Sequence, residues 1–255
     1  MTNKKSLSIA LVALSLAIFV QISARADDTK PSLIDPASLN GKWVGTVAYT
    51  TEYFSRGVSN ASAGVGAAQA GLEFEHATGV HVGVWGSSVD FPPPDSSANI
   101  ELDYSAGYRG NVTDAASYDL FATYYTYPRA RRADGLDFDF VEFTARGAYD
   151  FDFAKPYLAL NYSPYYQFES GMEWYVDSGV DVPLGRYLTA QLHAGYSTFQ
   201  RPIRSESHDY WDFSAGLSTN IAGLDFLLAY VTSTLRQSEC VGACDRVVLT
   251  VSKKF

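Results

Sequence analysis

Acidic and basic side chains occupy every second position in several segments of this sequence. Glu101, Asp103 and Arg109 alternate with apolar residues such as Leu102 and Tyr104. A period of two places alternate side chains on opposite faces of a β-strand, so these ionisable groups share one face. Charged side chains gathered along one wall can select the ions or polar solutes that pass it. The pattern therefore favours solute selection as the chemistry of these residues.

The same alternation assigns many more ionisable residues to this face. The set predicted to point inward is Glu52, Arg56, Glu73, Glu75, Glu101, Asp103, Arg109, Glu142, Arg146, Asp150, Glu173, Asp177, Asp181, Asp212 and Arg246, together with His193. Carboxylates outnumber arginines in this set. If the face encloses a narrow water-filled lumen, the lumen should favour cations or small polar solutes. The alternative is an interior plugged by acid–base pairs, because side chains fill small barrels.

Hydrolysis would require a nucleophile beside a general base. His193 and Ser197 lie four residues apart on one predicted strand, so they share a face but are about 13 Å apart, too far for a hydrogen bond. His208, with Asp209 or Glu206, falls in a predicted loop, where such side chains are more often solvated. The sequence thus predicts no catalytic residue and no cofactor. An outer-membrane hydrolase is the less favoured alternative, because the fold alone does not exclude it.

The only two cysteines, Cys240 and Cys244, are four residues apart. In an oxidising compartment we expect them to close a small disulfide loop. Two thiols with no histidine nearby make a poor zinc site, so metal-bound or free thiols are the less favoured alternatives.

Strand-like segments separated by turn residues run through the chain, without helical periodicity. We expect strands at about 42–55, 67–77, 80–91, 99–110, 117–127, 138–150, 155–167, 172–182, 187–199, 208–219, 223–235 and 245–255. These lengths suit strands that cross a bilayer at a tilt, which need about 9–11 residues. Short turns alternate with longer loops, as in outer-membrane barrels. The fold class predicted is all-β, a transmembrane antiparallel β-barrel of about 12 strands. The facing of 117–127 and 155–167 is left open, because both are almost entirely aromatic and apolar.

The turn at Ala77-Thr78-Gly79 predicts the register of one strand pair. A three-residue loop with a left-handed Gly79 pairs Glu75 with His81 and keeps both on the inner face. A shift by one residue would send every side chain of the strand to the other face.

Both ends of the chain carry features of exported proteins. Lys4 and Lys5 precede an apolar run of about 14 residues, and Ala26 is the expected cleavage site of a signal peptide. That run is shorter than the ~20 residues of a membrane-spanning helix, which is the alternative. The alternating last strand ends on Phe255 and resembles the C-terminal strand of bacterial outer-membrane barrels. In those proteins the terminal aromatic strand is the signal for the barrel-assembly machinery.

Composition and charge agree with this interpretation. Aromatic residues make up 15% of the chain, and the mean hydropathy of −0.08 is too polar for a helical membrane protein. The net charge is −9, and cleavage would remove three positive charges, leaving −12. An acidic protein is a poor partner for nucleic acid. Arginines of the predicted outer loops suit the phosphates of lipopolysaccharide, although ordinary solvated charge is an alternative. They are Arg129, Arg131, Arg132, Arg201, Arg204 and Arg236.

Three motifs lie between residues 45 and 110. They are Y-x-x-R-G-x-S starting at Tyr53, T-G-x-x-x-G-x-W-x-S-x-V starting at Thr78, and E-x-D-x-x-A-G-Y starting at Glu101. In these motifs the chain resembles the TorF family of outer-membrane porin-like proteins. The resemblance implies an outer-membrane barrel and supplies no catalytic residue.

The predicted organisation is a signal peptide at 1–26, a periplasmic lead-in at 27–41 and an outer-membrane β-barrel at 42–255. The expected function is a porin-like channel for passive diffusion, and the expected partners are outer-membrane lipid, lipopolysaccharide and the barrel-assembly machinery. The alternative function is a structural or adhesive barrel with a packed polar interior.

Overall fold

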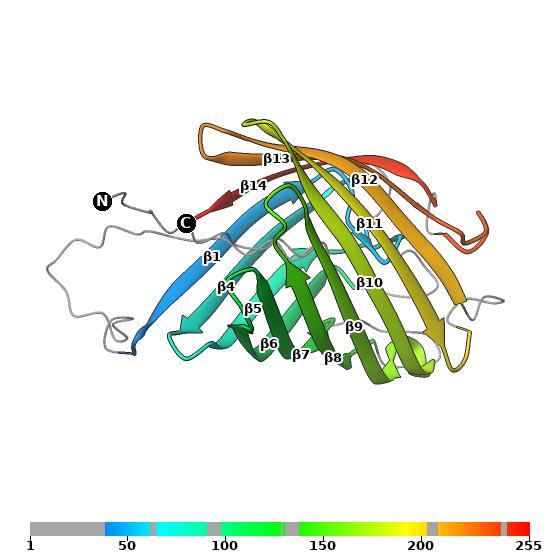
Figure 1. Ribbon diagram of the computed structural model, residues 1–255. Coiled ribbons are helices and arrows are strands. Elements are labelled where there is room, and N and C mark those ends of the chain that lie inside the picture. The colour runs from blue at the N-terminus through cyan, green and yellow to red at the C-terminus, as the bar shows by residue number, and fades with distance from the viewer. Residues whose placement is uncertain are drawn as a thin grey trace, which may run out of the picture.

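The computed structural model describes residues 39–61, 65–90, 98–128, 130, 138–202, 209–240 and 244–255. Within them the chain forms one closed barrel of twelve strands in which every pair of neighbours is antiparallel (Figure 1). The prediction of a closed all-β barrel of about 12 strands is confirmed. The predicted signal peptide and most of the lead-in lie outside the described residues.

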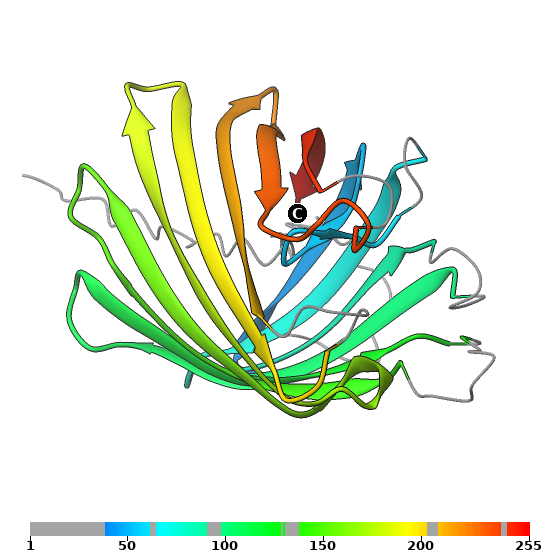
Figure 2. The ribbon, with the colours of Figure 1, turned by 90° about the vertical axis from the view of Figure 1, so that its right-hand side faces the viewer.

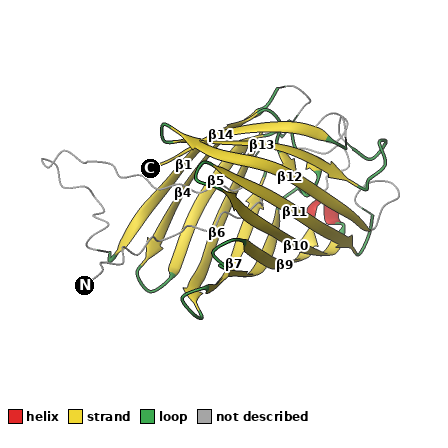
Figure 3. Cartoon of the chain, turned by 45° about the horizontal axis from the view of Figure 1, so that its top comes forward, coloured by secondary structure: helices red, strands yellow, loops and turns green. Residues whose placement is uncertain are grey.

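The strands follow one another around the barrel in chain order. They are β1 (Gly41–Thr50), β4 (Ala67–His76), β5 (Val80–Ser88), β6 (Ile100–Asn111), β7 (Ala116–Thr126), β8 (Phe140–Tyr149), β9 (Lys155–Tyr166), β10 (Gly171–Leu184), β11 (Leu188–Phe199), β12 (Asp209–Ile221), β13 (Leu224–Ser233) and β14 (Arg246–Lys254). Two very short strands, β2 (Phe54–Ser55) and β3 (Val58–Ser59), pair with each other in a separate hairpin. A 3-10 helix, η1 (Gln167–Glu169), is the one helix in the described part of the chain (Figure 3).

The barrel closes where β1 meets β14. Thr46 pairs with Lys254 and Thr50 with Thr250, and the hydroxyls of Thr50 and Thr250 are hydrogen-bonded at 3.0 Å. Closure gives every strand of the barrel a neighbour on both sides, which removes the free sheet edge that hydrocarbon would not tolerate.

The outer face of the barrel is apolar. Leu160 and Tyr104 are 46% and 50% exposed, whereas Glu101 is 2% exposed. Exposed aromatic side chains lie toward both strand ends, as in the girdles of membrane barrels. They include Tyr49, Tyr124, Trp174, Trp211 and Tyr230 at one end, and Tyr108, Tyr149, Phe151, Phe153 and Tyr187 at the other. In the described segments no helix has both the length and the apolar character needed to cross a membrane.

The two ends of the barrel differ in their connections. One end, here called the turn end, holds the start of β1, the end of β14 and five short turns. The opposite end, the loop end, holds the longer connections, including 51–66 and 234–245, and one short connection, 167–170. In Figure 1 the C-terminus and the start of β1 both lie toward the left, and Figure 2 shows the strands tilting around the wall between the two ends.

The predicted turn register is confirmed. Gly79 has a φ of +100°, and its N–H donates to the His76 carbonyl at 2.9 Å. Glu75 pairs with His81.

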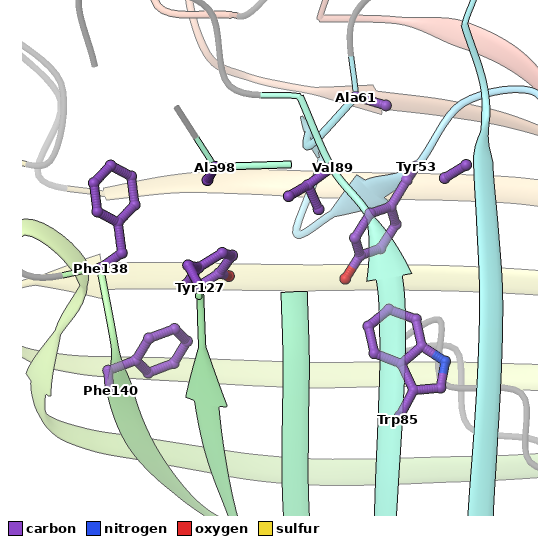
Figure 4. Close-up of a cluster of buried hydrophobic side chains, with 9 residues drawn as sticks. Tyr53, Ala61, Trp85, Val89, Ala98, Tyr127, Phe138 and Phe140 are labelled. Atoms are coloured by element: carbon purple, nitrogen blue, oxygen red, sulfur yellow. The ribbon is translucent and has the colours of Figure 1, made fainter. Parts of the chain in front are cut away.

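The buried apolar core lies inside the barrel, near the loop end. Tyr53 packs edge-on against Trp85 with ring centroids 5.7 Å apart, and Tyr127, Phe138 and Phe140 continue the cluster across neighbouring strands (Figure 4). Side chains therefore fill much of this part of the interior.

The predicted first strand, 42–55, is too long. β1 ends at Thr50, whose hydroxyl donates to the Glu52 carbonyl at 2.8 Å and turns the chain into the barrel. The next residues form the β2–β3 hairpin, in which Arg56 and Gly57 have φ values of +51° and +71°. Positive φ at both central residues is the signature of a two-residue type I′ turn. Glu52 and Arg56 thus reach the interior through a hairpin and not through strand alternation.

Candidate functional site: the barrel interior

The β2–β3 hairpin extends across the interior to the opposite wall. Arg56, at its tip, donates from its two terminal nitrogens to Glu173 on β10 and Glu142 on β8. The guanidinium also lies over the rings of Tyr175 and Tyr166, 4.5 Å and 5.3 Å from their centroids. Two carboxylates and two aromatic rings thus surround one cation, a favourable setting for a buried guanidinium.

Arg56 keeps its positive charge in this setting. Burial alone would lower the pKa of Arg56, but Glu142 and Glu173 outweigh that effect, and the pKa lies well above its ordinary value. With both carboxylates ionised, the three side chains carry a net charge of −1.

Gly57 allows the hairpin to approach the wall closely. A Cβ at this position would lie 2.6 Å from the Cβ of Asp212 on β12 and 2.9 Å from that of Ser233 on β13. No side chain larger than hydrogen fits such a contact without movement of the backbone, and the positive φ also favours glycine.

The base of the hairpin is held by Glu52. Its carboxylate accepts a hydrogen bond from the Ser59 hydroxyl at 2.8 Å and another from Arg246 Nε at 3.2 Å. Because Arg246 begins β14, this contact ties the hairpin to the strand that closes the barrel. Glu52 and Arg246, both predicted to face inward, are partners in the structure.

A second ionic cluster lies toward the turn end. Arg109 contacts Glu73 at 2.9 Å, Glu75 at 3.0 Å and Asp119 at 3.3 Å. His81 contacts Asp119 at 2.9 Å. Asp119 is absent from the set predicted to point inward, because its strand shows no polar–apolar alternation that would indicate which face it occupies.

A third cluster lies on β10, β11 and β12. His193 lies 3.0 Å from Asp177 and 3.6 Å from Asp212, and the Tyr175 hydroxyl lies 3.2 Å from His193 Nε2. The Ser197 hydroxyl is buried and has no hydrogen-bond partner in the described part of the chain. Among the described residues, Ser197 is therefore not attached to this acid–histidine network.

Glu101 and Asp103 are buried near the loop end, at 2% and 9% exposure. The Tyr127 hydroxyl donates to Glu101 Oε1 at 3.1 Å. Glu101 Oε2 and Asp103 Oδ1 are buried without a hydrogen-bond partner among the described residues. Burial, with a contribution from Glu101, raises the pKa of Tyr127, so its hydroxyl remains a neutral donor.

The remaining predicted interior residues lie nearer the turn end. Arg146 lies over the Tyr157 ring, 4.0 Å from its centroid. Asp150, just after β8, pairs with Lys155 at 2.9 Å, and the hydrogen bond from Lys155 holds the pKa of Asp150 below its ordinary value. Asp181 is half-buried on β10.

The loop end also holds the disulfide. Cys240 and Cys244 are bonded, with their Cα atoms 5.3 Å apart. Of the loop arginines, Arg201 and Arg236 fall within the described residues. Four others, Arg129, Arg131, Arg132 and Arg204, lie outside them, as do Glu206 and His208. Over the described residues, no group of three or more His, Cys, Asp or Glu side chains is placed to hold a metal ion.

Comparison with solved structures shows a porin-like barrel. The KdgM porin superposes with a TM-score of 0.55 at 11% identity, covering 82% of this chain and 99% of that one. OprD from Pseudomonas aeruginosa superposes with a TM-score of 0.44 at 12% identity, covering 83% of this chain and 64% of that one. The channel DcaP of Acinetobacter baumannii superposes with a TM-score of 0.41 at 12% identity, covering 85% of this chain and 74% of that one. The fold likeness rests on the KdgM porin.

At the level of sequence, comparison with curated proteins gives no match. The resemblance to the TorF family stays a prediction from the three motifs. A family model described as a bacterial protein of unknown function, Gcw_chp, matches residues 37–255. The chain therefore belongs to the Gcw_chp family.

Proposed function

We propose that this protein is an outer-membrane channel for passive diffusion of ions or small polar solutes, with a preference for cations. The observation that carries the proposal is a closed barrel, apolar outside, whose inner side holds more carboxylates than cationic side chains. Low-dielectric walls focus the field of such charges into the interior and raise the local concentration of cations. The motif resemblance to the TorF family supports the same location and class.

The β2–β3 hairpin is the constriction of this channel. It lies at the loop end, which is assigned to the outside because outer-membrane barrels place short turns toward the periplasm. Arg56 brings a positive charge into the constriction, but its two carboxylate partners more than balance it. The constriction therefore remains acidic.

Two partners belong to this proposal. Loop arginines at the outer rim would bind lipopolysaccharide phosphate, for which the planar guanidinium is suited. The barrel-assembly machinery would recognise the C-terminal strand, which ends on Phe255. A signal peptide cleaved after Ala26 would direct export.

A packed structural barrel is the second candidate. The deep burial of Glu101, Glu173 and Asp177, each at most 2% exposed, favours it. Small barrels without a lumen have interiors of this kind.

Conductance measurements in planar bilayers distinguish a channel from a packed structural barrel. The full-length protein, purified and refolded, should give discrete conductance steps, and a potassium chloride gradient should give a reversal potential of the sign set by cation flow. Absence of steps from correctly folded protein would overturn the channel and favour the packed barrel. Steps with an anion-selective reversal potential would overturn the cation preference alone.

A further inference from the structure

A cavity lies beside the tip of the β2–β3 hairpin, near the loop end. Seven aromatic side chains line it, and Tyr125, Tyr166, Phe199 and Tyr210 are among them. The polar lining includes Arg56, Asn60, Glu101, Gln167 and Glu239. A mainly aromatic wall with a few polar groups is typical of a small-molecule site.

One wall of this cavity already binds a cation of the protein itself. Tyr166, which lines the cavity, lies under the Arg56 guanidinium. Aromatic faces attract cations through the ring quadrupole, and the attraction strengthens where water is excluded. The same wall can therefore receive a cation from outside on its remaining rings.

Glu101 supplies an acceptor for that cation. Gln167 donates to the Tyr127 hydroxyl at 2.7 Å, and Tyr127 donates to Glu101 Oε1 at 3.1 Å. This chain of hydrogen bonds orients the carboxylate, while Glu101 Oε2 has no partner among the described residues. A buried carboxylate oxygen without a partner is costly, and a bound cation would offset that cost.

The balance of charge around the cavity also favours a cation over an anion. Arg56 is matched by Glu142 and Glu173, and the lining itself adds Glu101. An anion would meet this excess of carboxylates without an unmatched arginine among the described lining residues.

The size of the cavity limits the ligand. Its volume is about 80 Å³, whereas one buried water needs about 10–15 Å³ of such space. The cavity thus has room for a handful of non-hydrogen atoms.

We propose that this cavity is a binding site for a small organic cation, an ammonium or guanidinium group on a compact apolar body. The inference deepens the proposed channel function, because it names a class of solute that the channel would hold at its constriction.

Calorimetry on the folded full-length protein in detergent tests the site without reference to conductance. Choline is the probe, and 3,3-dimethylbutan-1-ol, its uncharged isostere, is the control ligand. Choline should bind, and the isostere should bind at least about tenfold more weakly, as expected from a loss of roughly 1.4 kcal/mol. Equal binding of the two, or no binding of choline, would overturn the proposal.

Paired variants place the site in the cavity. Tyr166→Leu and Glu101→Gln should each weaken choline binding about tenfold or more. Tyr165→Leu, on the outer face of the same strand at 77% exposure, and Asp114→Asn, in an exposed turn, should leave it unchanged. If Tyr166→Leu does not fold, Phe199→Leu tests another wall. Indifference of binding to the cavity variants would overturn the assignment.

The two proposals fail separately. If the protein conducts in bilayers but does not bind choline, the proposed cation site is refuted and the proposed channel stands. If the protein binds choline but does not conduct, the cation site stands and the channel is refuted.

Discussion

Arg56 and Glu173 form an ion pair inside the barrel although 117 residues separate them in the chain. Arg56 comes from the hairpin between β1 and β4, whereas Glu173 belongs to β10 on the far wall. The pair, shared with Glu142 on β8, fastens the hairpin across the interior. Removing one side of such a contact leaves buried charge without compensation, which makes the contact testable.

Arg56→Ala should destabilise the barrel and widen the channel. Leaving Glu142 and Glu173 unpaired should lower the free energy of unfolding by about 3–5 kcal/mol, measured by urea unfolding in phospholipid vesicles. Single-channel conductance should rise, because the hairpin loses its anchor. Adding Glu142→Gln and Glu173→Gln to the variant should restore much of the stability. If Arg56→Ala changed neither quantity, the hairpin would not depend on this pair.

Gly57→Ala should displace the hairpin even though every charge is kept. The new Cβ would meet the Cβ atoms of Asp212 and Ser233. Gly185→Ala is the matched control, since Gly185 also has a positive φ, +74°, but a Cβ there meets nothing within 4 Å. The control should lose only the backbone cost, about 1–2 kcal/mol, with unchanged conductance. Gly57→Ala should lose more and should raise the conductance. Equal effects of the two would show that the close contact with the wall is unimportant.

Glu101→Gln combined with Asp103→Asn should reduce the cation preference. Both carboxylates are buried near the constriction, where their field acts on the interior. The shift in reversal potential should be larger in 0.1 M salt than in 1 M salt, since the screening length falls from about 10 Å to about 3 Å. Asp114→Asn combined with Asp152→Asn, both in exposed turns, removes the same number of charges and is the matched control. A double variant with unaltered selectivity would mean that other groups set it.

Leu160→Arg should destabilise the protein more than Tyr165→Arg, because arginine costs more in the middle of the membrane than at its edge. Both side chains are exposed on the outer face of β9, at 46% and 77%, but Leu160 lies mid-strand and Tyr165 near its loop end. Arginine should cost about 2–4 kcal/mol at the first position and about 0–1 kcal/mol at the second. Unfolding in urea from phospholipid vesicles measures both. Equal costs would mean that the strand crosses the bilayer at a different depth.

Features that depend only on residues close together in the chain could be predicted from the sequence. A period of two placed Glu101 inside and Tyr104 outside, because successive side chains of a strand point to opposite faces. Turn chemistry at Gly79 determined the pairing of Glu75 with His81, because a short loop leaves little choice of register. The spacing of the two cysteines likewise predicted the disulfide.

The facing of β7 and β9 could not be predicted from the sequence, because apolar and aromatic residues occupy both faces of these strands. Closure of the barrel turned Asp119 and Asn161 inward and left Leu120 and Leu160 outside. The contacts between interior side chains could not be predicted from the sequence either. The residues that meet across a barrel depend on the order and register of all its strands. Arg56 shows this limit most clearly. Its motif is local, but its contacts with Glu142 and Glu173 exist only because twelve strands close around the hairpin.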